Sequence, residues 1–155
     1  MRRIAILCTL LLTACTSATT DEVTLLDGTP STIEELRMGR PAIINFWASW
    51  SRFSAEELVK LQNIHEQFSG ISVIGVNVQE SQPVARTYWD DNEFTFPSFL
   101  DPGKELKAEF DVFTEPTTIV LDAEGNVLFR KDGPITEPEL EQNIDLLLLE
   151  TATGQ

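Results

Sequence analysis

Residues 39–58 read GRPAIINFWASWSRFSAEEL, and this stretch decides the fold. Ala42–Trp47 is an apolar run of strand length, which is typical of a strand buried on both faces of a sheet. From Ser54 to Phe68 apolar residues recur at positions 58, 61, 64 and 68, which is a helical period. The stretch therefore predicts a buried strand that runs directly into an amphipathic helix.

The rest of the chain continues this alternation of strands and helices. In chain order we expect an extended segment at Val23–Leu26, a short helix at Ser31–Arg37, a buried strand at Ile71–Val78, helices at Gln82–Asp91 and Gly103–Phe110, a hairpin of Thr117–Leu121 and Val127–Arg130, and a closing helix at Glu137–Glu150. Ser31 and Glu34 have the spacing of a capping box for the first of these helices. The order predicts an α/β fold, with a mixed central sheet covered by helices on both faces.

Length and charge limit the classes of function. A chain of 155 residues has room for one domain with an ordinary core, which we place at residues 22–150, followed by a flexible tail at 151–155. The formal net charge is −14, and no segment carries a basic patch. Because phosphate binding needs clustered Lys and Arg, we expect no nucleic acid among the partners.

The N-terminal residues have the pattern of an export signal. Positive residues at Arg2 and Arg3 precede the apolar run Ile4–Leu12, which is too short to span a bilayer. The string LTAC that ends at Cys15 resembles the lipobox of bacterial lipoproteins. We therefore expect a signal peptide at 1–14, a lipidated Cys15 that begins a tether at 15–21, and an extracytoplasmic location, on the periplasmic side of the outer membrane in a cell with two membranes. The alternative is an ordinary secretory signal with a cysteine near its cleavage site.

A resemblance to a known family covers nearly all of residues 22–150. The stretch from Gly39 resembles the TlpA/ResA-like thioredoxin family, in which an NFWA(T/S)WC-x-x-C-x-x-E string runs from strand to helix. Downstream, FDVFTEPTTIVLDAEGNVLFRKDGPI resembles the cis-proline segment and hairpin of that family, and the region between, with VIGVNVQES and FTFPSFLD, resembles its insertion. The resemblance implies a thioredoxin-like fold and an exported thiol–disulfide oxidoreductase. It also implies a cis bond before Pro116, in a loop that offers backbone groups to an extended peptide.

The chain departs from this family at the reactive dithiol. Ser51 and Ser54 stand where the family has its two cysteines, and the only cysteines are Cys8 and Cys15. A hydroxyl forms no disulfide and needs a strong base to act as a nucleophile. The single histidine, His65, lies 11 residues beyond Ser54 along the expected helix, roughly 16 Å at about 1.5 Å per residue. We therefore expect no catalytic residue here, with Ser54 and Glu57 forming a capping box at the start of the helix.

The candidate binding residues are those that surround the two serines. Trp50 resembles the surface tryptophan at the site of the family, Phe53 lies between the serines, and Glu57 matches an acidic position of the family. Glu115 precedes Pro116, which would put its carboxylate beside Ser51; the alternative is an acidic residue of the loop that points into solvent. The sequence offers no Cys/His cluster for a metal and no Gly-rich phosphate loop, so we expect neither a metal nor a cofactor.

Two classes of function remain open from the sequence. The first is a membrane-anchored module without redox activity that binds a protein or peptide near Trp50, Glu115 and Pro116. The alternative is a thiol–disulfide oxidoreductase of cytochrome c maturation or envelope redox homeostasis. Such an enzyme would act with a borrowed thiol, or would have had its cysteines engineered to serine.

Overall fold

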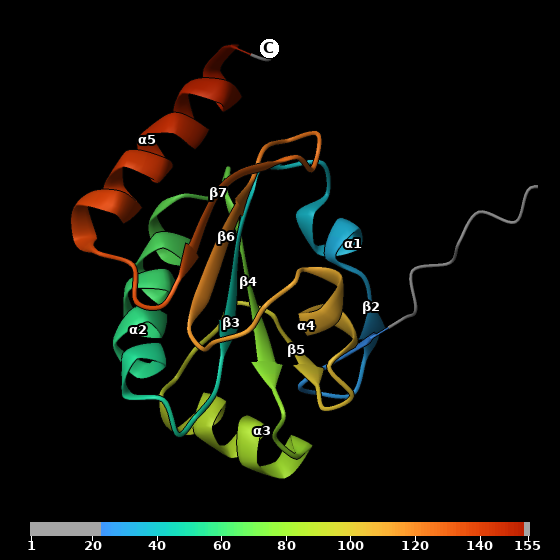
Figure 1. Cartoon of the computed structure of the whole chain (residues 1–155). Helices are drawn as coiled ribbons and strands as arrows, with labels where there is room; N and C mark the ends of the chain where they lie inside the picture. The colour runs from blue at the N-terminus through green and yellow to red at the C-terminus, as the bar shows by residue number, and fades with distance from the viewer. Residues whose placement is uncertain (1–22, 154–155) are drawn as a thin grey trace, which may run out of the picture.

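The computed structural model describes residues 23–153, which form one seven-stranded mixed sheet with helices on both faces (Figure 1). The elements in chain order are β1 (Val23–Leu25), β2 (Pro30–Ser31), α1 (Ile33–Arg37), β3 (Ala42–Trp47), α2 (Arg52–Gln67), β4 (Ser72–Val78), α3 (Gln82–Asp91), β5 (Ser98–Asp101), α4 (Glu105–Glu109), β6 (Thr117–Leu121), β7 (Val127–Asp132) and α5 (Glu137–Thr153). The α/β class and the mixed sheet predicted from the sequence are confirmed. The signal peptide, Cys15 and the tether lie outside the described residues.

The sheet has the order β2-β1-β5-β4-β3-β6-β7, and β3 and β5 each lie between a parallel and an antiparallel neighbour. Strand β3 pairs in parallel with β4 and antiparallel with β6, while β4 pairs in parallel with β5. The β6–β7 hairpin and the short β1–β2 hairpin form the two edges. Because β3 lies inside the sheet and leads into α2, the start of that helix is held by the most buried part of the molecule.

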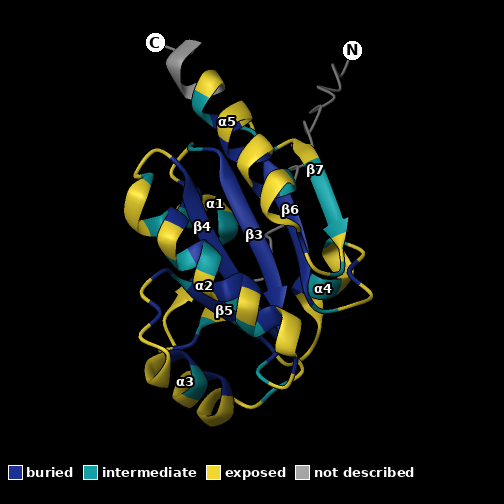
Figure 2. Ribbon diagram, turned by 90° about the vertical axis from the view of Figure 1, so that its left-hand side faces the viewer, coloured by how far each residue is buried: buried dark blue, intermediate teal, exposed yellow. Residues whose placement is uncertain are grey.

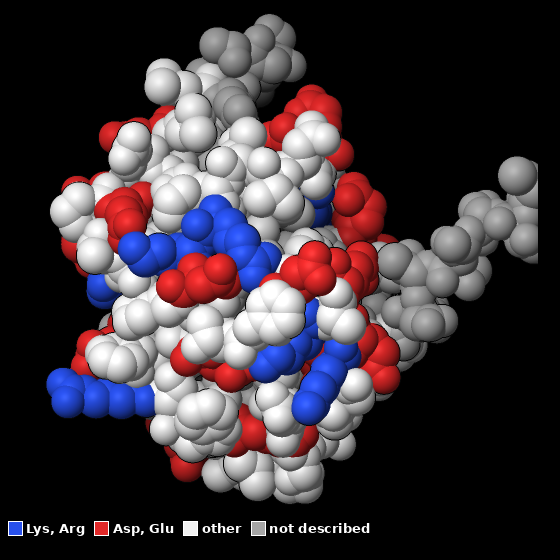
Figure 3. Space-filling view, viewed as in Figure 1, with Lys and Arg blue, Asp and Glu red and all other residues white. Residues whose placement is uncertain are grey.

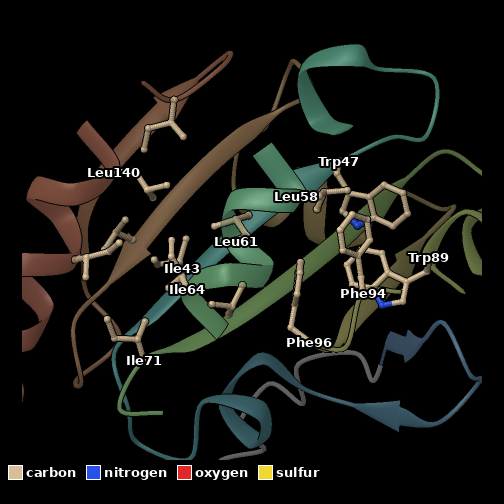
Figure 4. Close-up of a cluster of buried hydrophobic side chains, with 14 of the residues drawn as sticks. Ile43, Trp47, Leu58, Leu61, Ile64, Ile71, Trp89, Phe94, Phe96 and Leu140 are labelled. Atoms are coloured by element: carbon tan, nitrogen blue, oxygen red, sulfur yellow. The ribbon is translucent and has the colours of Figure 1, made fainter. Parts of the chain in front are cut away.

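Alternation along β3 divides the core into two layers. Ile43 and Trp47 pack with α2, α3 and α5 in one apolar cluster, which Figure 4 shows with Leu58, Leu61 and Trp89. Ala42, Ile44 and Phe46 belong to the other cluster, which includes residues of α1 and α4. Figure 2 shows the central strands buried and the outer faces of the helices exposed. The uninterrupted apolar run that predicted β3 is therefore explained by burial on both faces.

Several element boundaries differ from the sequence prediction. Helix α1 begins at Ile33 and is capped by Thr32 and Glu35, so the expected Ser31–Glu34 capping box is wrong by one position. Strand β5 was not expected at all, since its four residues carry no alternating pattern. Helix α5 continues to Thr153, so the expected tail at 151–155 is helical over its first three residues.

A buried arginine fastens the β6–β7 hairpin to α1. Arg37 is 2% exposed, and its Nη2 donates to the backbone oxygens of Asp122 (3.2 Å) and Ala123 (2.7 Å). Gly125, in the same turn, has φ +93°, and a Cβ there would lie 2.7 Å from the Arg37 guanidinium. The turn therefore requires glycine both for its backbone conformation and for the space taken by Arg37.

Among residues 23–153, no helix is long and apolar enough to cross a membrane.

Candidate functional site

Ser51 caps the N-terminus of α2, at the end of the short segment that connects β3 to this helix. Its backbone is extended (φ −88°, ψ 111°), and its Oγ accepts a hydrogen bond from the Ser54 N–H at 3.2 Å. This geometry is that of an N-cap. The sequence prediction that Ser54 is the cap, with Glu57 completing a capping box, is wrong by three positions. Ser54 lies inside the first turn, fully buried, where its Oγ accepts from the Ala48 N–H at 3.5 Å.

The loop before β6 lies directly against Ser51. The Ser51 Oγ donates to the Glu115 backbone oxygen at 3.4 Å, and the Glu115–Pro116 peptide bond is cis, as the resemblance implied. Pro116 is buried, while Phe113, three residues earlier, is 84% exposed. Within the described part of the chain, the Glu115 N–H has no hydrogen-bond partner. The loop therefore presents a backbone donor next to the two serines.

The Glu115 carboxylate does not face Ser51, where the sequence analysis expected it. It forms an ion pair with the Nζ of Lys107, on α4, and the two side chains are only 6% and 14% exposed. Only the backbone oxygen of Glu115 contacts Ser51. Lys107 was missed by sequence reasoning, because nothing in the local pattern of a short helix shows that one of its lysines reaches a loop eight residues on.

Glu57 lies behind the two serines rather than on the surface beside them. It is 2% exposed, and its Oε1 accepts from the Asn45 Nδ2 at 2.7 Å and from the Thr118 hydroxyl. Its Oε2 accepts from the Ile135 N–H at 3.1 Å. Burial raises the pKa of Glu57, and the hydrogen bonds from Thr118 and Ile135 oppose that rise. The carboxyl thus joins α2 to β3, β6 and the segment that precedes α5.

A second carboxylate fixes the segment just before Trp50. Glu80, which follows β4, accepts from the Ser49 N–H at 2.8 Å, from the Ser49 hydroxyl at 2.5 Å and from the Asn77 Nδ2 at 2.6 Å. Sequence reasoning did not single out Glu80. The signal that could have found it is an acidic residue two positions after a buried parallel strand, at the strand end where β3 also finishes.

Three exposed rings surround the serines and the loop. Trp50 is 68% exposed, Phe53 is 53% exposed and Phe113 is 84% exposed. Trp50 and Phe53 lie on either side of Ser51 in the chain, while Phe113 lies two residues before Glu115, whose backbone oxygen Ser51 contacts. We call Trp50, Phe53 and Phe113 the aromatic surface. Exposed rings grouped next to backbone donors are typical of a surface that binds protein.

The described residues contain no group of three or more His, Cys, Asp or Glu side chains placed to hold a metal ion. The hollow between α2 and α5, of about 470 Å³, is lined by residues such as Lys60, Ile64 and Leu140 and does not include the serines. The exposed rings and the loop backbone beside Ser51 form a surface, a shape that suits a segment of polypeptide better than a small molecule.

Comparison with known proteins identifies the family. Residues 16–130 match the AhpC/TSA family. The chain is 29% identical over 125 residues to thioredoxin-like protein YneN of Bacillus subtilis, covering 78% of this chain and 72% of that protein. It is 32% identical over 124 residues to the thiol:disulfide interchange protein HelX of Rhodobacter capsulatus, covering 79% and 69%.

Solved structures agree in fold. StoA from Bacillus subtilis superposes with a TM-score of 0.67 at 26% identity, over 79% of this chain and 94% of that one. A secreted disulfide oxidoreductase of Mycobacterium tuberculosis superposes with a TM-score of 0.73 at 18% identity, over 82% and 96%. The chain therefore belongs to the AhpC/TSA family, with the thioredoxin-like fold of the thiol–disulfide oxidoreductases related to ResA, StoA and HelX.

Proposed function

We propose that this protein binds extended polypeptide segments at the aromatic surface and the 113–116 loop, and that it exchanges no disulfide with thiols of its own. The observation that carries the proposal is the pair Ser51 and Ser54, in a chain without a cysteine between residues 16 and 155. The Ser51 hydroxyl keeps both the helix cap, at 3.2 Å, and the contact with the loop, at 3.4 Å. A polypeptide held there would be bound reversibly, since no mixed disulfide can form with serine.

A second candidate function is thiol–disulfide exchange with a thiol supplied by another molecule. The names of the relatives favour it, because HelX is a thiol:disulfide interchange protein and ResA and StoA are thiol–disulfide oxidoreductases. These names agree better with a role in thiol–disulfide exchange than with a binding module that has no redox function. In this second function the protein would hold the polypeptide while the electrons pass through the thiols of a partner.

The location we propose is extracytoplasmic, with Cys15 lipidated and the domain held at a membrane face. The supporting features are the LTAC string and the secreted relative in Mycobacterium tuberculosis. Two acyl chains give stable anchoring where one gives marginal binding. Mass spectrometry of the N-terminus tests this directly: an unmodified Cys15, or a Cys15→Ala protein that still fractionates with membranes, would overturn it.

An insulin reduction assay with dithiothreitol separates the first function from ordinary oxidoreductase activity. We expect the wild-type protein to leave the uncatalysed rate unchanged, and the Ser51→Cys/Ser54→Cys variant, as the positive control, to accelerate it. Acceleration by the wild type above a heat-killed sample would contradict the proposal. To test the second candidate, reduced thioredoxin is added as the source of thiol. A rate above that of thioredoxin alone supports a borrowed thiol.

Polypeptide binding is tested on its own with a labelled, reduced and alkylated protein that stays unfolded. Phe113→Ala should weaken binding by roughly tenfold, about 1.4 kcal/mol, as for a central aromatic of a binding surface. The matched control is Val127→Ala, because Val127 is 57% exposed and pairs with Leu121, at the end of the β6–β7 hairpin far from the loop. Equal losses in the two variants would remove the aromatic surface from the proposal.

A further inference from the structure

Some of the charged side chains around the aromatic surface form ion pairs, in a chain that as a whole is strongly acidic, with a net charge of −14. The ion pairs on this part of the molecule are Arg52–Glu56 (3.0 Å), Lys107–Glu115 and Arg130–Asp132 (2.9 Å). Figure 3 shows basic and acidic side chains interleaved on the face that carries α2, α4 and the loop before β6. These pairs balance part of the charge on this face, while the carboxylates of Glu80 and Asp111 form no ion pair with a described residue.

The Lys107–Glu115 pair is the one that belongs to the loop itself. Glu115 stands between the exposed ring of Phe113 and the cis-proline, and its backbone oxygen contacts Ser51. Its side chain is only 6% exposed and forms an ion pair with Lys107, whose side chain is 14% exposed. A carboxylate in such a place is costly without a partner, and the pair removes both the charge and its field from the surface beside it.

We propose that the aromatic surface takes an uncharged, apolar segment of an extended polypeptide, and that Lys107 sets this preference by neutralising Glu115. The inference rests on the proposed function and adds the chemical class of the segment. An apolar side chain next to the loop would cover the rings of Phe113 and Trp50, while the Glu115 N–H would donate to a backbone oxygen of the segment. A Lys, Arg, Asp or Glu at the same place would lose its hydration without gaining a partner.

Three synthetic peptides serve as probes. They share one extended, apolar sequence of twelve residues that contains no cysteine. They differ only at one central position, which is Ala, Lys or Glu, and each carries a fluorophore at its end. With the purified wild-type protein we expect the Ala peptide to bind most tightly, and the Lys and Glu peptides to bind about tenfold more weakly, because each would bury an unpaired charge.

The Lys107→Met variant tests the role of the ion pair. It leaves the Glu115 carboxylate without a partner, so the Lys peptide should now bind at least as well as the Ala peptide, and the Glu peptide should bind more weakly than before. Glu115→Gln should produce the opposite order, favouring the Glu peptide, because it leaves Lys107 unpaired. The double variant Lys107→Met/Glu115→Gln should regain the wild-type order, since neither charge remains.

Lys104→Met is the matched control. Lys104 is an exposed lysine one helical turn before Lys107, and it pairs with no carboxylate among residues 23–153. This variant should keep the wild-type order of the three peptides. If Lys107→Met does not fold, as judged by circular dichroism, the Glu115→Gln and double variants still decide the question.

The outcomes separate this inference from the proposed function. If the wild type binds all three peptides equally, or if Lys107→Met and Glu115→Gln both keep the wild-type order, the inference is wrong while polypeptide binding stands. If none of the peptides binds, and the unfolded protein used above does not bind either, the proposed function fails as well. A preference for the Lys peptide in the wild type would show that the segment is cationic and would also overturn the inference.

Discussion

Glu57 lies in an environment very different from that of an exposed glutamate. Its carboxyl is buried behind the serines and receives hydrogen bonds from Asn45, Thr118 and Ile135. Burial is the main cause of its raised pKa. In the absence of a thiol at positions 51 and 54, we interpret this carboxyl as an anchor that holds α2 against the sheet.

The raised pKa predicts how the stability depends on pH. Glu57 contributes stability that is complete below its unfolded pKa, near 4.5, and is lost as the pH rises through its higher folded pKa. Glu57→Gln should lower the free energy of unfolding by about 1–3 kcal/mol at pH 4.5. The amide group of the new side chain would then place an N–H donor against the Ile135 N–H, so the hydrogen bond that the Glu57 Oε2 accepts would be lost. The difference from the wild type should shrink as the pH rises to 8. Urea unfolding over this range measures it.

The control for this experiment is Glu66→Gln, an exposed position on the same helix. Asp101 also has a raised pKa from burial, so only the difference between wild type and variant isolates Glu57. A difference that stays constant from pH 4.5 to 8 would mean that the pKa of Glu57 is not raised.

Ser51 and Ser54 have the geometry that a disulfide needs. Helical neighbours three apart have Cβ atoms about 5–6 Å apart, and a disulfide wants roughly 3.5–4.5 Å. Ser51 lies just outside the helix with extended backbone, so the gap can close. Ser51→Cys/Ser54→Cys should form an intramolecular disulfide under mild oxidant, measured by counting free thiols. Thiols that stay reduced, or that cross-link only between molecules, would contradict the thioredoxin-like placement of these residues.

The reduced form of the same variant reports on the charges of the loop. The thiol at position 51 should titrate below the ordinary value of about 8.5, because the helix N-terminus stabilises its thiolate. Adding Lys107→Met should raise the pKa of this thiol, because it leaves the negative charge of Glu115 unpaired. Adding Glu115→Gln should lower the pKa of the thiol, because it leaves the positive charge of Lys107 unpaired. Alkylation rates as a function of pH measure the two shifts.

At the scale of elements, the start of α5 is fixed by a capping box and an ion pair. The Glu139 carboxylate accepts from the Thr136 N–H at 2.9 Å, from the Thr136 hydroxyl at 2.7 Å and from the Lys131 Nζ at 2.7 Å. The hydrogen bond from Lys131 is the largest cause that lowers the pKa of Glu139 from 4.5 to about 2, followed by those from Thr136. The carboxylate thus ties α5 to β7.

This element loses stability in acid. The contribution of Glu139 is present above its unfolded pKa of 4.5 and is lost as the pH falls through about 2. Glu139→Gln should therefore lower the stability at pH 6, and the gap to the wild type should close between pH 4.5 and 2. Thermal unfolding followed by circular dichroism measures the gap. Glu141→Gln, an exposed position in the same helix, should show no such closing.

The sequence predicted the positions of most elements but not all their ends. The long strands β3 and β4 came from clear apolar runs and the helix α3 from a weaker pattern, and the structure places all three within one residue of the prediction. The start of α2 was misplaced because two serines and one glutamate all satisfy capping rules, and only the packing of Glu57 decides between them. Local sequence carries no information on a contact such as Glu57–Ile135, which spans 78 positions.

The same reasoning applies to the candidate site. Ser51, Trp50 and Pro116 could be placed from motifs, because those motifs fix a strand, a turn and a helix start. The direction of the Glu115 side chain could not, since it depends on a lysine of another element. Whether a loop acid faces a site or turns away from it is decided by tertiary packing.

At the scale of the whole molecule, the acidic surface is the dominant feature. With 25 acidic and 11 basic residues, the folded state concentrates repulsion that the unfolded chain relieves. Sodium chloride screens this repulsion, so the melting temperature should rise between 10 mM and 500 mM salt. Differential scanning calorimetry checks the direction, with potassium chloride as a second salt. A melting temperature that falls with both salts would mean that the surface ion pairs outweigh the net repulsion.

The contact of Arg37 with the β6–β7 turn has a consequence for anyone who extends or labels this protein. Residues 122–126 look like an ordinary hairpin loop, the kind of site at which insertions are usually tolerated. Here the turn carbonyls are bound by an arginine 85 positions earlier in the chain, and its glycine leaves the space for that guanidinium. A tag or grafted epitope at this turn would take from the buried Arg37 the two carbonyls that its Nη2 binds, and leave it only its contacts with Arg40 and Glu34. The turn at residues 122–126 should be left intact, and a tag or epitope is better inserted at another site.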